Sequence, residues 1–207
     1  MDAKIWWKYW WRALIAAQCM RCIPGVRMIG LNGSLVTGRW HAESDIDFLI
    51  AVKPGRIFTV RALSLLCTQL LGLRRSGSKI AGKICMNWYV TTDKLEIEPR
   101  DEYCARTYHN LIPLLDDGET YAKYRQANQW MRSFAYAPTL HLPVLKIGEV
   151  TRLMQSIAGL ILGTWFERWV ERRQTIRVEN DPRRLTKGSI VRVGPQELRF
   201  HLKKEHY

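Results

Sequence analysis

The segment Val26-Arg27-Met28-Ile29-Gly30-Leu31-Asn32 runs into Gly33-Ser34, and ten residues later the chain reads Asp45-Ile46-Asp47-Phe48-Leu49-Ile50. The apolar pattern of the first segment predicts a short strand over residues 26–32 that stops at the Gly-Ser pair. Glycine permits backbone angles closed to other residues, and serine can cap a following helical turn. We therefore expect a sharp turn at Gly33 and Ser34 whose N–H groups and hydroxyl are suited to hold a phosphate.

The second segment predicts a buried strand that begins with two carboxylates. Side chains alternate along a strand, so Asp45 and Asp47 point to one face while Ile46 and Phe48 point to the other. Two acids this close repel each other unless a cation lies between them, and oxygen ligands of this kind suit Mg²⁺ or Mn²⁺. Such ions can position a nucleoside triphosphate and stabilise the attacking and leaving oxygens of an in-line displacement.

A Gly-Ser turn, a ten-residue interval and Asp-x-Asp at the start of an apolar strand resemble the signature of the DNA polymerase beta-like nucleotidyltransferase superfamily. From Lys83-Ile84-Cys85-Met86-Asn87 through Ala127-Asn128-Gln129-Trp130, the chain also looks like uncharacterised bacterial and archaeal nucleotidyltransferase-domain proteins. The resemblance implies that Gly33 and Ser34 bind the nucleotide, together with the catalytic, metal-binding pair Asp45 and Asp47. The alternative for each half of the motif is an ordinary turn and a solvated strand start.

The chain departs from that family pattern at the third acid, which the superfamily commonly supplies from the next strand of the sheet. Residues 79–90 predict this strand, but it contains no acid. Cys85, Asn87 and Tyr89 share one face by alternation. Asn87 alone offers a neutral carbonyl oxygen suitable for magnesium, so it is the expected third metal ligand.

Positive charge dominates the composition. The chain has 207 residues, 32 Lys plus Arg against 19 Asp plus Glu, and a net charge of +13, which favours RNA, DNA or an anionic membrane surface as partners. Between Asp47 and Asp93 no acid occurs, while a run of cations does. We expect nucleic-acid contacts from Arg56, Arg61, Arg74 and Arg75, and a solvated face is the equally weighted alternative. His41, in the connection between the two motif segments, is a weaker candidate for a general base.

The cysteines and apolar runs bear on the compartment. Five cysteines lie mostly within apolar segments, and their odd number argues against a disulfide framework and for a reducing environment. The start of the chain lacks the features of a signal peptide, and no apolar run reaches the ~18 residues that span a bilayer. A cytoplasmic protein is therefore expected.

The predicted fold is α+β, with a polymerase beta-like head in residues 1–140, built as a small mixed sheet with flanking helices, and a mostly helical region with a terminal hairpin in residues 141–207. Helices are expected over residues 3–22, 56–73, 100–115, 119–134 and 144–173, the last with a kink near Gly159 or Gly163. The hairpin is expected from strands at residues 189–193 and 197–202 around Gly194-Pro195. Four tryptophans on the first helix predict packing on the sheet, or else a surface for a partner or membrane.

The expected function is a metal-dependent transfer of a nucleoside monophosphate from an NTP, most simply ATP, to a hydroxyl acceptor. The charge makes RNA, such as a tRNA end, the preferred acceptor. A protein hydroxyl is the enzymatic alternative, as in adenylyltransferases of the superfamily that modify a toxin. A catalytically silent nucleic-acid- or partner-binding protein of the same fold is the alternative from another class, because the third acid is missing.

Overall fold

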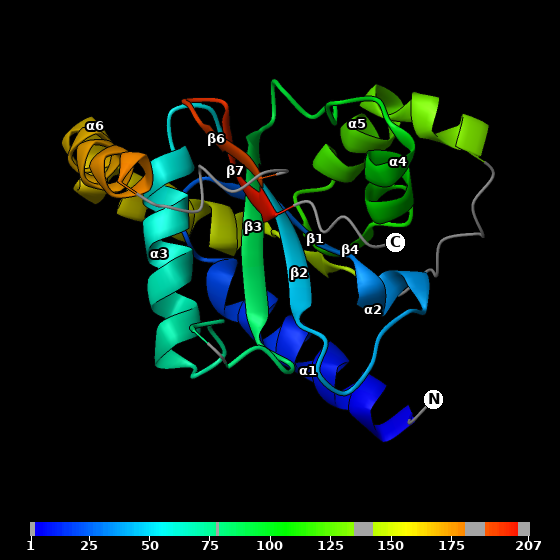
Figure 1. Ribbon diagram of the computed structural model, residues 1–207. Helices are drawn as coiled ribbons and strands as arrows, with labels where there is room; N and C mark the ends of the chain where they lie inside the picture. Colours follow the sequence, from blue (N-terminus) through cyan, green and yellow to red (C-terminus); the bar gives the residue numbers. More distant parts are fainter. Residues whose placement is uncertain (1–2, 78, 135–142, 181–188, 203–207) are drawn as a thin grey trace.

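The computed structural model describes residues 3–77, 79–134, 143–180 and 189–202 (Figure 1). Its strands are β1 (Val26–Asn32), β2 (Ile46–Val52), β3 (Ile84–Thr91), β4 (Ile112–Asp116), β5 (Leu145–Lys146), β6 (Ser189–Val193) and β7 (Glu197–Leu202). Its helices are α1 (Ala3–Met20), α2 (Ser34–Thr37), α3 (Ile57–Leu70), α4 (Glu102–Tyr108), α5 (Thr120–Ala127) and α6 (Glu149–Glu179), with a 3₁₀ helix, η1 (Gln129–Phe134).

The strands of the described residues form one mixed sheet in the order β5-β4-β1-β2-β3-β7-β6. β1 pairs antiparallel with both β2 and β4, whereas β2 and β3 are parallel. The hairpin β6–β7 adds to the sheet because β7 pairs with β3. The α+β fold with a mixed sheet, a helical C-terminal region and a hairpin is confirmed. The division at residue 140 stays a prediction, since strands from both sides of it join the same sheet.

Both faces of the sheet are covered, so the residues of β2 divide between two cores by simple alternation. Ile46, Phe48 and Ile50 belong to a core that α1 and α3 complete. Leu49 and Ala51 belong to a second core that α4, α5 and η1 complete. Figure 1 shows α1 and α3 away from the α4–α5 group, with the sheet between them. Asp47 lies on the face of the second core, at the end of β2 where that core gives way to polar groups.

The tryptophans of α1 divide between the two expected roles. Trp10 is buried, and Trp6 stacks on it with ring centroids 5.6 Å apart. Trp7 and Trp11 are more than half exposed. Packing on the sheet thus accounts for the inner side of α1 and leaves an aromatic outer side.

The predicted helix over residues 100–115 is wrong in its second half. α4 ends at Tyr108, and residues 112–116 form β4, which pairs with the edge of β1. Pro113 cannot donate a helical hydrogen bond, and the apolar residues around it gain buried partners on the sheet edge. The predicted helix over residues 119–134 also divides, into α5 and η1.

The kink predicted in α6 near Gly159 or Gly163 lies at Gly163, where φ is 59° and ψ is −172°. Beyond the kink, the buried carboxylate of Glu167 accepts hydrogen bonds from the backbone N–H groups of Phe58 and Thr59 at the start of α3 (3.0 and 2.8 Å). These N–H groups have no partner within their own helix, and the positive end of the helix dipole favours an anion there. Glu167 therefore joins α6 to α3.

Before the kink, the inner face of α6 is polar and its outer face is apolar, which is the reverse of the usual surface helix. Its inner face carries Thr151 and Gln155, which are 4% and 5% exposed. Gln155 donates to the carbonyl oxygen of Arg21 (2.7 Å) and accepts from the guanidinium of Arg27 (3.2 Å). Leu160 and Ile161 are 82% and 73% exposed on the outside. The inner face of this half is thus held by hydrogen bonds.

Two findings concern the compartment. Cys19 of α1 and Cys67 of α3, which are 48 residues apart in sequence, form a disulfide, whereas the cysteine count argued against a disulfide framework. Among the described residues, no helix combines the length and apolar character needed to cross a bilayer. The cytoplasmic location remains a prediction.

Candidate functional site

The turn after β1 brings Gly33 against Asp47. Gly33 has φ 74° and ψ −153°, a conformation that favours glycine, and a Cβ there would overlap Oδ2 of Asp47. Ser34 then begins the single turn of α2, and its carbonyl oxygen accepts from the N–H of Arg39 at 3.1 Å. The predicted turn and the predicted acid pair therefore meet, although a whole connection separates them in sequence.

The register of the sheet decides what surrounds Asp47. Asn32 of β1 lies opposite it on one side, and Cys85 of β3 lies opposite it on the other. Between Phe48 and Leu49 the pairing with β3 shifts by one residue. Phe48 pairs with Met86 and Leu49 with Trp88, so Asn87 has no paired residue on β2. A shift of this kind is a local bulge, which redirects side chains near it.

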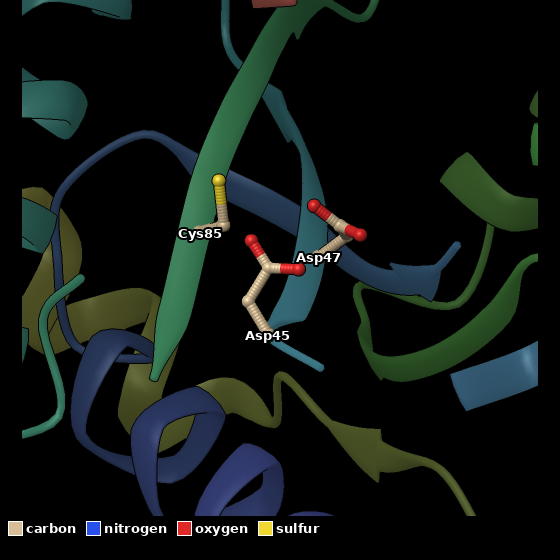
Figure 2. A group of neighbouring side chains, drawn as sticks. All are labelled: Asp45, Asp47 and Cys85. Carbon is tan, nitrogen blue, oxygen red and sulfur yellow. The ribbon is translucent and has the colours of Figure 1, made fainter. Parts of the chain in front are cut away.

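Cys85 is the side chain that completes a cluster with the two acids. One ligand atom from each of Asp45, Asp47 and Cys85 lies within 4.8 Å of the others. Figure 2 shows the thiol of Cys85, from β3, near the carboxylates of Asp47, from β2, and of Asp45, which directly precedes β2. Burial raises the pKa of the Cys85 thiol, and the charges of Asp47 and Asp45 raise it further. The thiol therefore keeps its proton at neutral pH.

Asn87 has a different relation to the acids from the one expected. Its amide nitrogen donates to Oδ1 of Asp47 at 3.0 Å, and the residue is 7% exposed. In this orientation Asn87 presents a donor to Asp47, and the amide has to rotate to offer its oxygen to a metal ion. Cys85 also lies beside both acids. The assignment of Asn87 as the third metal ligand stays a prediction.

Arg75 contributes the positive charge of the cluster. Its Nη1 lies 2.5 Å from Oδ2 of Asp45 and 3.4 Å from Sγ of Cys85. Sequence analysis grouped this residue with nucleic-acid contacts and gave no sign of the pairing with Asp45. The segment between α3 and β3 folds back along β3, where the N–H of Arg75 donates to the carbonyl oxygen of Ile84 at 3.1 Å.

A cleft of about 1070 Å³ is lined by Gly33, Ser34, Asp45, Asp47 and Arg75. Its walls come from the β1–α2 turn, the start of β2, the segment before β3, and α4. Basic side chains on these walls are Arg39, Arg75, Lys79, Lys83 and Arg106, and His41 lies among them. The backbone N–H of Glu43 donates to Nδ1 of His41 at 3.3 Å. Glu43 and Glu102 also line the cleft, and Glu102 pairs with Arg106. The acid pair with the remaining cations around it is suited to a cation together with a polyphosphate.

Two of the four arginines predicted to contact nucleic acid are used inside the protein. Arg56 donates to the carbonyl oxygens of Gly163 and Gly159 in α6 (2.8 and 3.0 Å). Arg61 donates to Oε1 of Gln174 (2.6 Å) and lies over the ring of Phe200. Their guanidiniums bind α6 and the hairpin, away from the cleft. Arg74 forms an isolated parallel β-bridge with Ile84. Its contact with nucleic acid stays a prediction.

Comparison with known proteins agrees with this geometry. Residues 16–103 match the family model of the nucleotidyltransferase domain. The match runs from α1 through the Gly-Ser turn, both acids and β3 to the start of α4. No curated protein matches the chain. The family match confirms the resemblance drawn from Gly33, Ser34, Asp45 and Asp47, and it supports nucleotidyl transfer in general terms.

Proposed function

We propose, from the nucleotidyltransferase domain in residues 16–103, that this protein moves a nucleoside monophosphate from an NTP to a hydroxyl acceptor in the presence of a divalent cation. One observation carries the proposal. Gly33, which forms the turn suited to phosphate, lies in contact with Asp47, one of the two acids suited to the cation. Both open into the same cleft.

The donor groups fit Mg²⁺, with Mn²⁺ as the alternative. Mg²⁺ is commonly held by one or two carboxylates together with substrate phosphates and water, so Asp45 and Asp47 suffice for it. Cys85 offers sulfur, a soft ligand that suits softer ions better than Mg²⁺. A bound ion supplies charge stabilisation for the oxygens of the transferring phosphoryl group.

The chain's own residues do the positioning. The Gly33-Ser34 turn holds the triphosphate against the acids, and Arg39, Lys79 and Lys83 offset the charge of its outer phosphates. The acceptor oxygen attacks the α-phosphorus, and the bond between that phosphorus and the pyrophosphate oxygen breaks. Pyrophosphate leaves with the bonding electrons, and the proton of the acceptor hydroxyl passes to His41 or to water. No carboxylate stands where the superfamily commonly has its third acid, so His41 and solvent are the acceptors for that proton.

RNA is the acceptor that the charge favours, with a tRNA end as one form of it and ATP as the expected donor. The net charge of +13 and the basic walls of the cleft support a polyanionic partner. Lys79 and Lys83, with Arg39 across the cleft, replace Arg56 and Arg61 in this role. A protein hydroxyl as acceptor is the alternative outcome of the same test.

A silent nucleotide-binding protein of the same fold is the second candidate. The observation in its favour is Cys85, a protonated thiol at the position facing both acids, with the guanidinium of Arg75 beside it. Such a site keeps the means to bind an NTP and lacks a base for the acceptor.

Incubation of the purified protein with each α-labelled NTP, Mg²⁺ or Mn²⁺, and total RNA tests the proposal. We expect label in RNA, and none with D47N, which removes a metal ligand. Label on protein instead identifies a protein acceptor. If NTP binds with the metal ion but no label moves to any acceptor, the silent binding protein is correct and the transfer proposal is wrong.

A further inference from the structure

Arg75 occupies the position where a cation is needed. A single guanidinium nitrogen contacts two of the three groups of the cluster, Oδ2 of Asp45 at 2.5 Å and Sγ of Cys85 at 3.4 Å. The same three groups are the ones suited to a metal ion. The acids therefore already have a positive partner that the chain itself supplies.

The ion pair between Arg75 and Asp45 is exposed to solvent and therefore weak. The side chains of Arg75 and Asp45 are 39% and 20% exposed. Ion pairs of this exposure are weak and are screened by salt. The guanidinium also lines the cleft in which Arg39, Lys79 and Lys83 lie. A side chain at the cleft wall can leave Asp45 without entering an apolar environment.

We propose that Arg75 is an exchangeable counter-cation of the acid pair. It neutralises Asp45 when no divalent ion is bound, and it turns into the cleft, toward the phosphate oxygens of the NTP, when the ion takes its place. This inference rests on the proposed function, because it assumes that Asp45 and Asp47 bind the ion.

Arg75 and a metal ion compete for the carboxylate of Asp45, and this competition couples the position of Arg75 to metal binding. A guanidinium 2.5 Å from Oδ2 of Asp45 repels a metal ion bound to the same carboxylate. Binding of the ion and pairing of Arg75 are therefore negatively coupled, and the coupling is reciprocal. The triphosphate reverses it, because phosphate oxygens give the displaced guanidinium a new bidentate partner. NTP and metal ion thus strengthen each other's binding through Arg75.

Titration with Mn²⁺ in the absence of nucleotide tests the exchange, with wild type, R75Q, R39Q and D45N compared by electron paramagnetic resonance. R39Q removes the same charge from the same cleft without touching Asp45 in the structure, and it measures the general electrostatic effect. We expect R75Q to bind Mn²⁺ about two- to fivefold more tightly than R39Q. This range corresponds to the free energy of an ion pair with this exposure. R75K keeps the charge but loses the planar fork, so it should fall between wild type and R75Q.

With a non-hydrolysable NTP present, the order of wild type and R75Q should reverse. R75Q then lacks the guanidinium that binds phosphate and should lose affinity for the nucleotide. Equal gains in R75Q and R39Q, or no gain in R75Q while wild type binds Mn²⁺, would overturn the exchange and leave the proposed function intact. Absence of Mn²⁺ binding in wild type and every variant would overturn the metal site and the exchange together. Thermal melting of each variant confirms that the comparison is between folded proteins.

Discussion

Gly33 and Asp47 lie so close that a single Cβ on the glycine would overlap the carboxylate of the acid. The turn that is suited to phosphate and the acid that is suited to a metal ion are therefore one packed unit. Any change that enlarges residue 33 has to move Asp47, the loop, or both.

We expect G33A to abolish metal-dependent NTP binding and to lower stability by about 1–3 kcal/mol, because alanine is strained in this backbone conformation and displaces Asp47. Calorimetric titration with a non-hydrolysable NTP and thermal melting measure the two effects. Gly55 is the matched control, since it has the same φ of 74° and open space where a Cβ would lie. G55A should cost stability alone. NTP binding by G33A at the wild-type level would show that the turn does not serve the nucleotide.

The two acids should respond differently to neutralisation. D45N and D47N are both expected to lose metal-dependent NTP binding, because each removes a charged ligand. In metal-free buffer, D47N should melt at or above the wild-type temperature, since it relieves repulsion between carboxylates. D45N should gain nothing, because it also removes the partner of Arg75. Melting curves with and without Mg²⁺ provide the measurement, and a higher melting temperature for D45N than for D47N contradicts the pairing.

Placing a third carboxylate at Cys85 should strengthen the metal site. C85D puts an acid opposite Asp47 in the register of β2 and β3, so Mg²⁺ affinity should rise by about tenfold or more, as expected for a charged ligand in place of a thiol that stays protonated. N87D is the comparison on the same face. It exchanges the donor to Oδ1 of Asp47 for a second anion, and it should destabilise the metal-free protein. Should N87D alone raise Mg²⁺ affinity, the earlier assignment of Asn87 as the third ligand is the correct one.

RNA binding should depend on cleft cations rather than on the arginines that hold α6. Each phosphate contact contributes a log–log salt slope of about −0.7 for single strands, so K79Q/K83Q should reduce the magnitude of the slope by about 1.4. R61Q should leave the slope unchanged and lower thermal stability, because Arg61 binds Gln174 and Phe200. Filter binding at several salt concentrations measures the slopes. A flat salt response in wild type means that RNA is not bound through its phosphates.

Because the first half of α6 is polar inside and apolar outside, substitutions on its two faces should affect stability in the reverse of the usual way. Q155A should cost about 1–3 kcal/mol, because it leaves the part-buried carbonyl oxygen of Arg21 without its side-chain donor. L160K should change stability by less than about 0.5 kcal/mol, because Leu160 is 82% exposed. Denaturant unfolding of both variants tests the orientation of this half of the helix. A large loss from L160K together with tolerance of Q155A means that the apolar face is the inner one.

The sequence by itself determined the parts of this protein that depend on local pattern. Alternation along β1 and β2 placed Asp45 and Asp47 on one face, and glycine was required where the chain turns after β1. Helical periodicity located α1 and α3 to within a few residues, and Gly194-Pro195 located the hairpin. These features follow from φ and ψ preferences and from side-chain direction, which neighbours in sequence decide.

Tertiary structure alone decided what completes the site. The register of β2 with β3 puts Cys85 opposite Asp47, and a shift of one residue after Phe48 leaves Asn87 without a paired residue on β2. The pairing of Arg75 with Asp45 requires the segment before β3 to fold back over 30 residues of chain. Residues 112–116 form strand β4 rather than a helix because they pair with β1. Arg56 donates a hydrogen bond to a carbonyl oxygen of α6 rather than lying in solvent. In each case the deciding contact joins segments far apart in sequence, and its free energy appears only after the sheet and its helices have packed.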